Sequence, residues 1–142
     1  MGSVHADQQV LDAMQAGDPD EPVVMLNLLK YRDQAEAGHG VDGLTGRQAY
    51  EKYGRAFAEL QPRFGGEPIW MGRGEHTVIG DVEWDIIILV RYPTRRQFIA
   101  MFNDPDYAAI APMRAAALSD SRLIESRQLI PKQSEEVENS NG

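Results

Sequence analysis

The chain has 142 residues and is 42% hydrophobic, which fits one folded domain rather than a disordered chain. It contains no cysteine, and this excludes disulfides, thiolate zinc sites, iron–sulfur clusters and cysteine nucleophiles. The net charge is −8, with five acids and no lysine or arginine in the first 21 residues. No basic face for phosphate binding is visible, so we expect no nucleic-acid partner. No apolar run approaches the roughly 18 residues of a membrane span, so we expect no membrane association and a cytoplasmic location.

The first half of the chain is predicted to form two helices around one strand and a long loop. Residues 5–16 are expected to be a short helix that ends near a glycine. Residues 23–32 (VVMLNLLKYR) are predicted to be the first strand, because the run is short and begins with β-branched residues. Residues 33–44 contain three glycines and little periodicity, which predicts a loop. Thr45 and Gln48 have the spacing of a capping box, so the second helix is expected to begin there.

The second half alternates strand and helix signals in the same way. Glycines at 72 and 74 indicate one broken strand or a hairpin, whereas Pro93 marks the end of the clearest strand in the chain. Proline after an aspartate at 104 predicts the start of a helix. The predicted elements are strand segments 67–73 and 76–80, a strand at 84–92, helices from 94 and from 104 to 118, and a final strand at 121–129.

This order, a helix followed by β-α-β-β-α-β, predicts an α+β ferredoxin-like fold with a four-stranded antiparallel sheet and helices on one face. We expect a helical extension over residues 1–21, the ferredoxin-like domain over 22–130 and an acidic flexible tail over 131–142. The other face of such a sheet has no cover within one chain. A second copy is the simplest cover, so a homodimer is expected.

Alternation along two strands predicts which side chains face the helices. In the first strand, the parity that contains Leu26 is purely aliphatic and is assigned to the helices, so Asn27 and Tyr31 are expected on the uncovered face. In the strand before Pro93, Ile88 is assigned to the helices and Arg91 to the uncovered face. An apolar face with a few polar groups is the usual form of a small-molecule site, so the site is expected there.

Five segments in this order resemble domain-of-unknown-function family 1330, which belongs to the dimeric α/β-barrel superfamily. The likeness covers about residues 22–129, and the N-terminal helix and the acidic tail lie outside it. The segments are MLNLLKYR (25–32), LTGRQAYEKYG (44–54), GGEPIWMGR (65–73), VIGDVEWDIIILVRYP (78–93) and DPDYAAIAPMRAAALSDSRLI (104–124).

The resemblance implies a homodimer whose two sheets close into a barrel, but it implies no reaction. Related barrels include cofactor-free quinone-forming monooxygenases, lactone isomerases and haem-binding proteins. Analogy at the level of the fold is a weak reason to assign any of these activities.

Three polar side chains are candidates for holding a ligand. Asn27 is a lone amide in an apolar stretch and could orient a carbonyl or an oxyanion; the alternative is an ordinary structural hydrogen bond. Arg114 lies on an inward helix stripe, where it needs either a carboxylate partner, Asp85 or Asp106, or an anionic ligand. Arg91 has the same two interpretations.

Aromatic and titratable residues complete the candidate site. Trp70 and Tyr31 could stack on a flat ligand, although such residues more often fill a core or an interface. His76 is a candidate general base, against the alternative of an exposed strand histidine. The three histidines show no metal-ligand spacing, so no metal is expected, and no cofactor fingerprint is present.

The leading prediction is a dimeric α/β-barrel protein that binds a small, partly apolar molecule bearing a carbonyl or carboxylate group in a barrel cavity. Asn27 and His76 are its candidate catalytic residues; Asn27, Tyr31, Trp70, Arg91 and Arg114 are its candidate ligand contacts. Two alternatives stay open: a cofactor-free monooxygenase or isomerase, and an accessory dimer with no ligand. The sequence alone does not decide whether the protein is an enzyme.

Overall fold

The computed structural model describes residues 2–132, and its elements follow the predicted order. The acidic tail predicted for 131–142 lies almost wholly outside the described residues. The elements are α1 (Gln8–Gln15), β1 (Val23–Tyr31), α2 (Gly46–Leu60), the 3-10 helix η1 (Gln61–Phe64), β2 (Glu67–Arg73), β3 (Ile86–Tyr92), α3 (Arg95–Phe102), α4 (Pro105–Ala117) and β4 (Leu118–Ser126).

The helices begin where side chains satisfy their first backbone N–H groups. Thr45 and Gln48 form both hydrogen bonds of the capping box that opens α2. The Thr94 hydroxyl accepts a hydrogen bond from the N–H of Gln97 at the start of α3. Asp104 caps α4, whose first residue is a proline. Short-range signals therefore set the three helix starts correctly.

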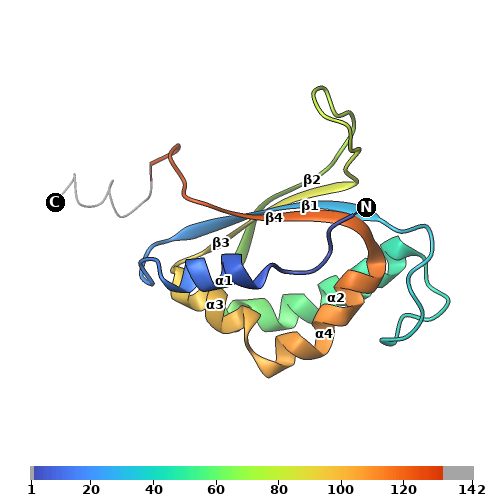
Figure 1. Cartoon of the computed structure of the whole chain (residues 1–142), viewed down its shortest axis with the longest axis horizontal. Coiled ribbons are helices and arrows are strands. Elements are labelled where there is room, and N and C mark those ends of the chain that lie inside the picture. Colours follow the sequence, from blue (N-terminus) through green and yellow to red (C-terminus); the bar gives the residue numbers. More distant parts are fainter. Residues whose placement is uncertain (1, 133–142) are drawn as a thin grey trace.

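The four strands form one antiparallel sheet in the order β2-β3-β1-β4, and the α+β ferredoxin-like fold is confirmed. Helices α1 to α4 lie on one side of the sheet (Figure 1). The core between these layers includes Leu29, Tyr92 and Leu118, all less than 3% exposed. The two longest helices, α2 and α4, pack against each other over the sheet.

The register of β1 corrects the predicted faces of that strand. Asn27 is paired with Ile88 of β3, and paired residues in antiparallel strands point to the same side. Ile88 belongs to the buried core, as predicted, so Asn27 also faces the helices. Leu26 and Leu28, which were assigned to the helices, instead lie on the uncovered face. The prediction failed because both parities of β1 are rich in apolar side chains.

The predictions for residues 76–80 and for the last strand were also wrong. Residues 76–80 form no strand; they belong to a loop, 74–85, that joins β2 to β3. The last strand spans Leu118–Ser126 and not 121–129; it begins three residues early because α4 passes into β4 without a loop. The Leu118 backbone is already extended at the end of the helix.

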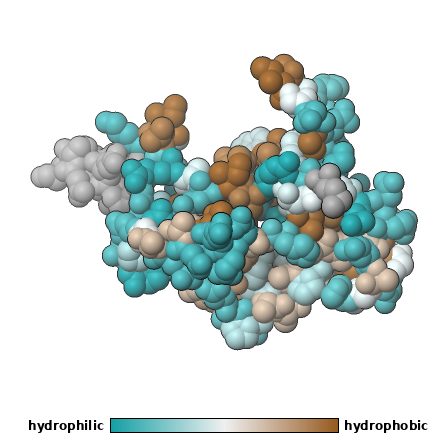
Figure 2. Space-filling view, in the orientation of Figure 1, coloured by the Kyte–Doolittle hydropathy of each residue, from teal (hydrophilic) through white to brown (hydrophobic). Residues whose placement is uncertain are grey.

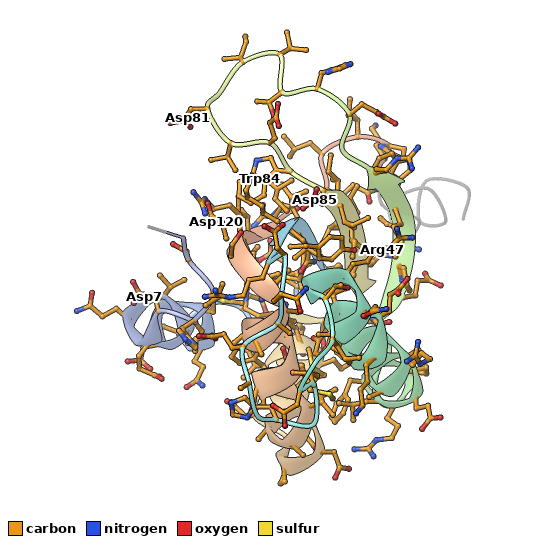
Figure 3. All side chains as sticks on the ribbon, turned by 90° about the vertical axis from the view of Figure 1, so that its right-hand side faces the viewer. Asp7, Arg47, Asp81, Trp84, Asp85 and Asp120 are labelled. Atoms are coloured by element: carbon orange, nitrogen blue, oxygen red, sulfur yellow. The ribbon has the colours of Figure 1, made fainter. Side chains whose placement is uncertain are left out.

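The loop 74–85 rises from the uncovered side of the sheet, and the described helices leave that face open (Figure 1). Its base is fixed by hydrogen bonds from Gly74 N–H to the Asp85 carbonyl and from Asp85 N–H to the Leu29 carbonyl. Trp84 and Asp85 lie at this base, and Asp81 lies farther out along the loop (Figure 3). Val78 and Ile79 are 92% and 93% exposed near its tip, which appears brown in Figure 2.

The segment between α1 and β1 is fastened to the helical side of the molecule, not to the open face. Arg95 of α3 binds the Glu125 carboxylate at 2.7 Å and the Asp18 carbonyl at 2.6 Å, and lies 3.5 Å from the Glu21 carboxylate. The Arg95 side chain is only 11% exposed, so these acids neutralise a largely buried charge. The uncovered face therefore remains uncovered by the N-terminal extension.

Candidate functional site

A cavity of about 220 Å³ lies between the sheet and the helices. Its floor is formed by side chains of β1 and β3, including Met25, Asn27 and Val90. One wall comes from α2 and η1, and the opposite wall comes from α3 and α4. The side chains on these walls that carry polar atoms are Tyr50, Tyr53, Gln61, Tyr107 and Arg114.

Arg114 is the charged side chain of this cavity. It extends from the last turns of α4, and its Nη2 atom is buried without a hydrogen-bond partner. Within residues 2–132, no carboxylate lies within ion-pair distance of Arg114. The two acids predicted as its partners are engaged elsewhere: Asp106 binds Arg63, and Asp85 Oδ2 accepts a hydrogen bond from the N–H of Tyr31. The half-buried guanidinium lies close to the neutral Tyr50 hydroxyl but has no compensating negative charge, so its position favours an anionic partner from outside the chain.

Asn27 faces the same cavity from the floor. Its Nδ2 atom donates a long hydrogen bond of 3.4 Å to the Met25 carbonyl. This contact lies at the weak end of hydrogen-bond geometry, so it leaves the amide available to other partners. The structure thus brings Asn27 and Arg114, two of the predicted ligand contacts, to one cavity.

Tyrosines of α2 and α4 supply neutral hydroxyl groups to the walls of the cavity. The hydroxyl oxygens of Tyr53 and Tyr107 lie 3.3 Å apart. Burial raises the pKa of Tyr50 to about 12, although the nearby positive charge of Arg114 opposes this rise. Burial likewise holds the pKa of Tyr53 well above its usual range. The phenols of Tyr50 and Tyr53 therefore remain protonated at neutral pH and can serve as hydrogen-bond donors.

The cavity opens between α2 and the edge strand β2. Ala58 and Pro68 are exposed there, and Met71 is 62% exposed although it also lines the cavity. Gly54 sits on the same side of α2, and a Cβ added to it would meet no atom within 4 Å. No close approach requires a glycine at this position. Its absent side chain leaves space at the mouth of the cavity.

The remaining predicted contacts do not line this cavity. Trp70 lies on the uncovered face, where its ring packs over Gly72. Arg91 lies on that face too, in an ion pair of 2.9 Å with Glu67. Tyr31 is on the helix side beside Tyr50, with ring centroids 6.0 Å apart, but outside the cavity lining.

His76, the predicted general base, is exposed in the loop 74–85 and is not in the cavity. The loop projects from the uncovered side, whereas Asn27 faces the helices. The structure of one chain therefore separates the two residues that were predicted to act together.

Sequence reasoning missed the contributions of Tyr50, Gly54 and Gln61 to the cavity. Helical periodicity carried a signal for them, because positions 50, 54, 58 and 61 fall on one side of a helix. The sequence could not show that this side faces an unfilled space rather than a packed core.

Residues 2–132 contain no group of three or more potential ligands placed to hold a metal ion. None of their helices has the length and apolar character to cross a bilayer.

Comparison with known proteins gives one family and several solved structures. The family model described as "Domain of unknown function (DUF1330)" matches residues 41–126. A protein of unknown function from Rhodopseudomonas palustris is 35% identical, covers 92% of this chain and 100% of its own, and superposes with a TM-score of 0.85. No curated protein matches the chain.

Two more distant structures share the fold. A hydroxynitrile lyase from Passiflora edulis is 13% identical over 81% of this chain and 100% of its own, with a TM-score of 0.57. A dimeric protein of unknown function and ferredoxin-like fold from Bacteroides fragilis is 13% identical over 75% of this chain and 96% of its own, with a TM-score of 0.52. At this identity the likeness extends to the fold alone.

Proposed function

The chain belongs to the family of the domain of unknown function DUF1330, as its sequence motifs predicted, and on this premise we propose that it binds a small, partly apolar molecule carrying a carboxylate or carbonyl group. The site is the cavity between the sheet and the helices, not the uncovered face favoured by the sequence. The observation that carries this proposal is the buried Arg114 Nη2 atom, which makes no hydrogen bond within residues 2–132 and belongs to a side chain that lines the cavity.

A carboxylate placed at Arg114 would satisfy the free guanidinium nitrogen with a charge-assisted hydrogen bond. The Asn27 amide, with its one weak bond, would orient a second oxygen of the same group. The apolar remainder of the ligand would contact Met25, Phe57 and Val90, which line the cavity. A few polar groups in a mostly apolar cavity are typical of small-molecule sites.

Binding is favoured over acid–base catalysis by the chemistry of the cavity lining. Among the described residues that line it, none is a histidine, a carboxylate or a lysine. Burial raises the pKa values of Tyr50, Tyr53 and Tyr92, so these phenols do not act as bases near neutral pH. This supports a ligand-binding role more than a proton-transferring isomerase, and the unfilled cavity speaks against a purely structural dimer.

Titration calorimetry with benzoate and benzyl alcohol tests the proposal. The natural protein should bind benzoate at least about tenfold more tightly than the neutral alcohol, since a hydrogen bond to a charged group contributes roughly 1.5–3 kcal/mol. Arg114→Met should abolish this preference, and Arg114→Lys should retain part of it. Arg91→Met is the matched control, because Arg91 lies on the other face in an ion pair. An unchanged preference in Arg114→Met would exclude Arg114 as the anion site.

The proposal includes a homodimer formed through the uncovered face. Leu26, Leu28, Ile87 and Leu89 lie on this face, and Ile124 is 48% exposed there. Contiguous apolar surface of this kind marks an interaction site in a soluble protein. A dimeric protein of the same fold is among the similar structures. The loop 74–85 projects from the same side with an apolar tip, so it would pack against the second copy.

A further inference from the structure

Gln61 is a buried amide that the binding of one carboxylate does not use. It begins η1 directly after α2, is 5% exposed and lines the cavity. Among the described residues its buried Nε2 atom makes no hydrogen bond of ordinary geometry, although Gln61 lies close enough to the Tyr92 hydroxyl to lower a pKa that burial raises to about 12. A buried donor left unpaired is destabilising, and an apolar side chain of the same length would avoid that cost. The amide nitrogen has two N–H groups, and the Tyr92 hydroxyl can accept from only one of them, so Gln61 keeps a donor for an acceptor from outside the chain.

The surroundings of Gln61 hold it in place. Its backbone N–H donates to the Phe57 carbonyl, and its own carbonyl accepts the N–H of Gly66 at 3.2 Å. A Cβ added to Gly66 would lie 2.6 Å from Cγ of Gln61 and 2.7 Å from the ring of Tyr92. The glycine thus permits the backbone at 66 to pack closely on both side chains and limits their movement. Such a fixed donor is suited to recognition.

Gln61 and Arg114 lie toward opposite ends of the cavity. Arg114 is close to Tyr50, and Gln61 follows Tyr50 by eleven residues, which is about 16 Å along a helix axis. Between them the wall of α2 presents Tyr53 and Phe57, whose rings stack with centroids 5.6 Å apart. The cavity therefore has a cationic end, an aromatic middle and a neutral donor at the other end.

The volume limits the molecule that could occupy both ends. The cavity measures about 220 Å³, whereas a cavity of about 150 Å³ accommodates benzene. There is room for one ring, or a chain of similar size, with a small polar substituent at each end. Extending the proposed function, on which this inference rests, we propose that the ligand is a small monocarboxylic acid with a carbonyl or ether oxygen at the opposite end of an apolar body. The carboxylate binds Arg114, and the neutral oxygen accepts a hydrogen bond from Gln61.

Two probes of nearly equal shape test the second subsite. 4-Acetylbenzoate carries a carbonyl oxygen opposite its carboxylate, and 4-isopropylbenzoate carries a methyl group there. The natural protein should bind the acetyl compound about fivefold more tightly, the effect of one hydrogen bond. Gln61→Met should bind both equally and, without ligand, melt at the same or a higher temperature. A residue that serves only the fold would instead lower the melting temperature. Gln9→Met, the same change at an exposed position of α1, should keep the preference.

The other outcomes separate this inference from the proposed function. If benzoate binds but neither substituted probe does, or if Gln61→Met keeps the preference for the acetyl compound, the Gln61 subsite is wrong and the Arg114 site stands. Equal binding of the two probes by the natural protein also overturns the subsite alone. If benzoate and both probes fail to bind, the proposed function is wrong and the subsite falls with it.

Discussion

The hydroxyl oxygens of Tyr53 in α2 and Tyr107 in α4 lie 3.3 Å apart in the wall of the cavity. This contact joins the two large helices on the helical side of the sheet. Tyr50 packs beside Tyr53 with ring centroids 5.3 Å apart. Because burial raises the pKa of both Tyr50 and Tyr53, the wall is neutral at physiological pH, and the charge of the cavity comes from Arg114.

Alkaline pH should destabilise the protein through Tyr50. Its pKa is about 12 in the folded chain, whereas an unfolded phenol titrates near 10. The stability contributed by the neutral phenol is therefore fully present below pH of about 10 and is lost as the pH rises through about 12. Tyr50→Phe should reduce the loss of unfolding free energy over this interval by about 2–3 kcal/mol. Urea unfolding between pH of about 7 and 12 measures this, and parallel curves for both proteins would refute it.

Gly54 should control access to the cavity. Gly54→Ala should raise the free energy of unfolding by about 1 kcal/mol, because alanine favours a helix interior and the added methyl group meets no atom. It should bind benzoate as the natural protein does. Gly54→Phe should fill the mouth and slow benzoate association at least about tenfold, as measured by stopped flow. Arg55→Phe, at the next and exposed position, is the control. Equal association rates in the natural protein and Gly54→Phe would place the entrance elsewhere.

The uncovered face should carry the dimer. Sedimentation velocity should show a dimer of the natural protein and a monomer for Ile124→Glu, because a buried, unpaired carboxylate at the interface is costly. Ile79→Asp, at the loop tip, should weaken the dimer less. Val10→Asp is the control, since Val10 is 55% exposed but lies in α1 on the helical side. A monomeric natural protein would contradict the proposed dimer. A dimer unaffected by Ile124→Glu would show that the interface lies elsewhere.

The sequence predicted the fold well because its signals are local. The capping box at Thr45, the Thr94 cap and the proline at 105 set helix starts, and the strand order follows from the sequence of elements. The face of β1 failed for a physical reason. Leu26 and Leu28 are as apolar as a core but lie on the open face, while Asn27 faces the helices. Parity within one strand could not separate these cases; pairing with Ile88 of β3 does.

The residues of the site were predicted only in part, because the sequence did not show which side of the sheet each one faces. Asn27 and Arg114 do line one cavity, whereas Trp70 and Arg91 lie on the opposite face and His76 lies in a loop. A strand histidine near a polar face looks like a general base, but residues 76–80 form no strand. Composition cannot reveal an unfilled volume, which depends on how far α2 and α4 stand from the sheet.

The central claim is that the ligand binds on the helical side of the sheet, and neighbouring isoleucines of β3 report on the two sides. Ile88 lines the cavity, and Ile87 points to the uncovered face. Methyl-labelled NMR spectra during a benzoate titration should show saturable shifts of the Ile88 δ-methyl and Met25 ε-methyl signals, with Ile87 and Ile124 unmoved. Shifts confined to Ile87 and Ile124, or no shift at saturating benzoate, would contradict the account.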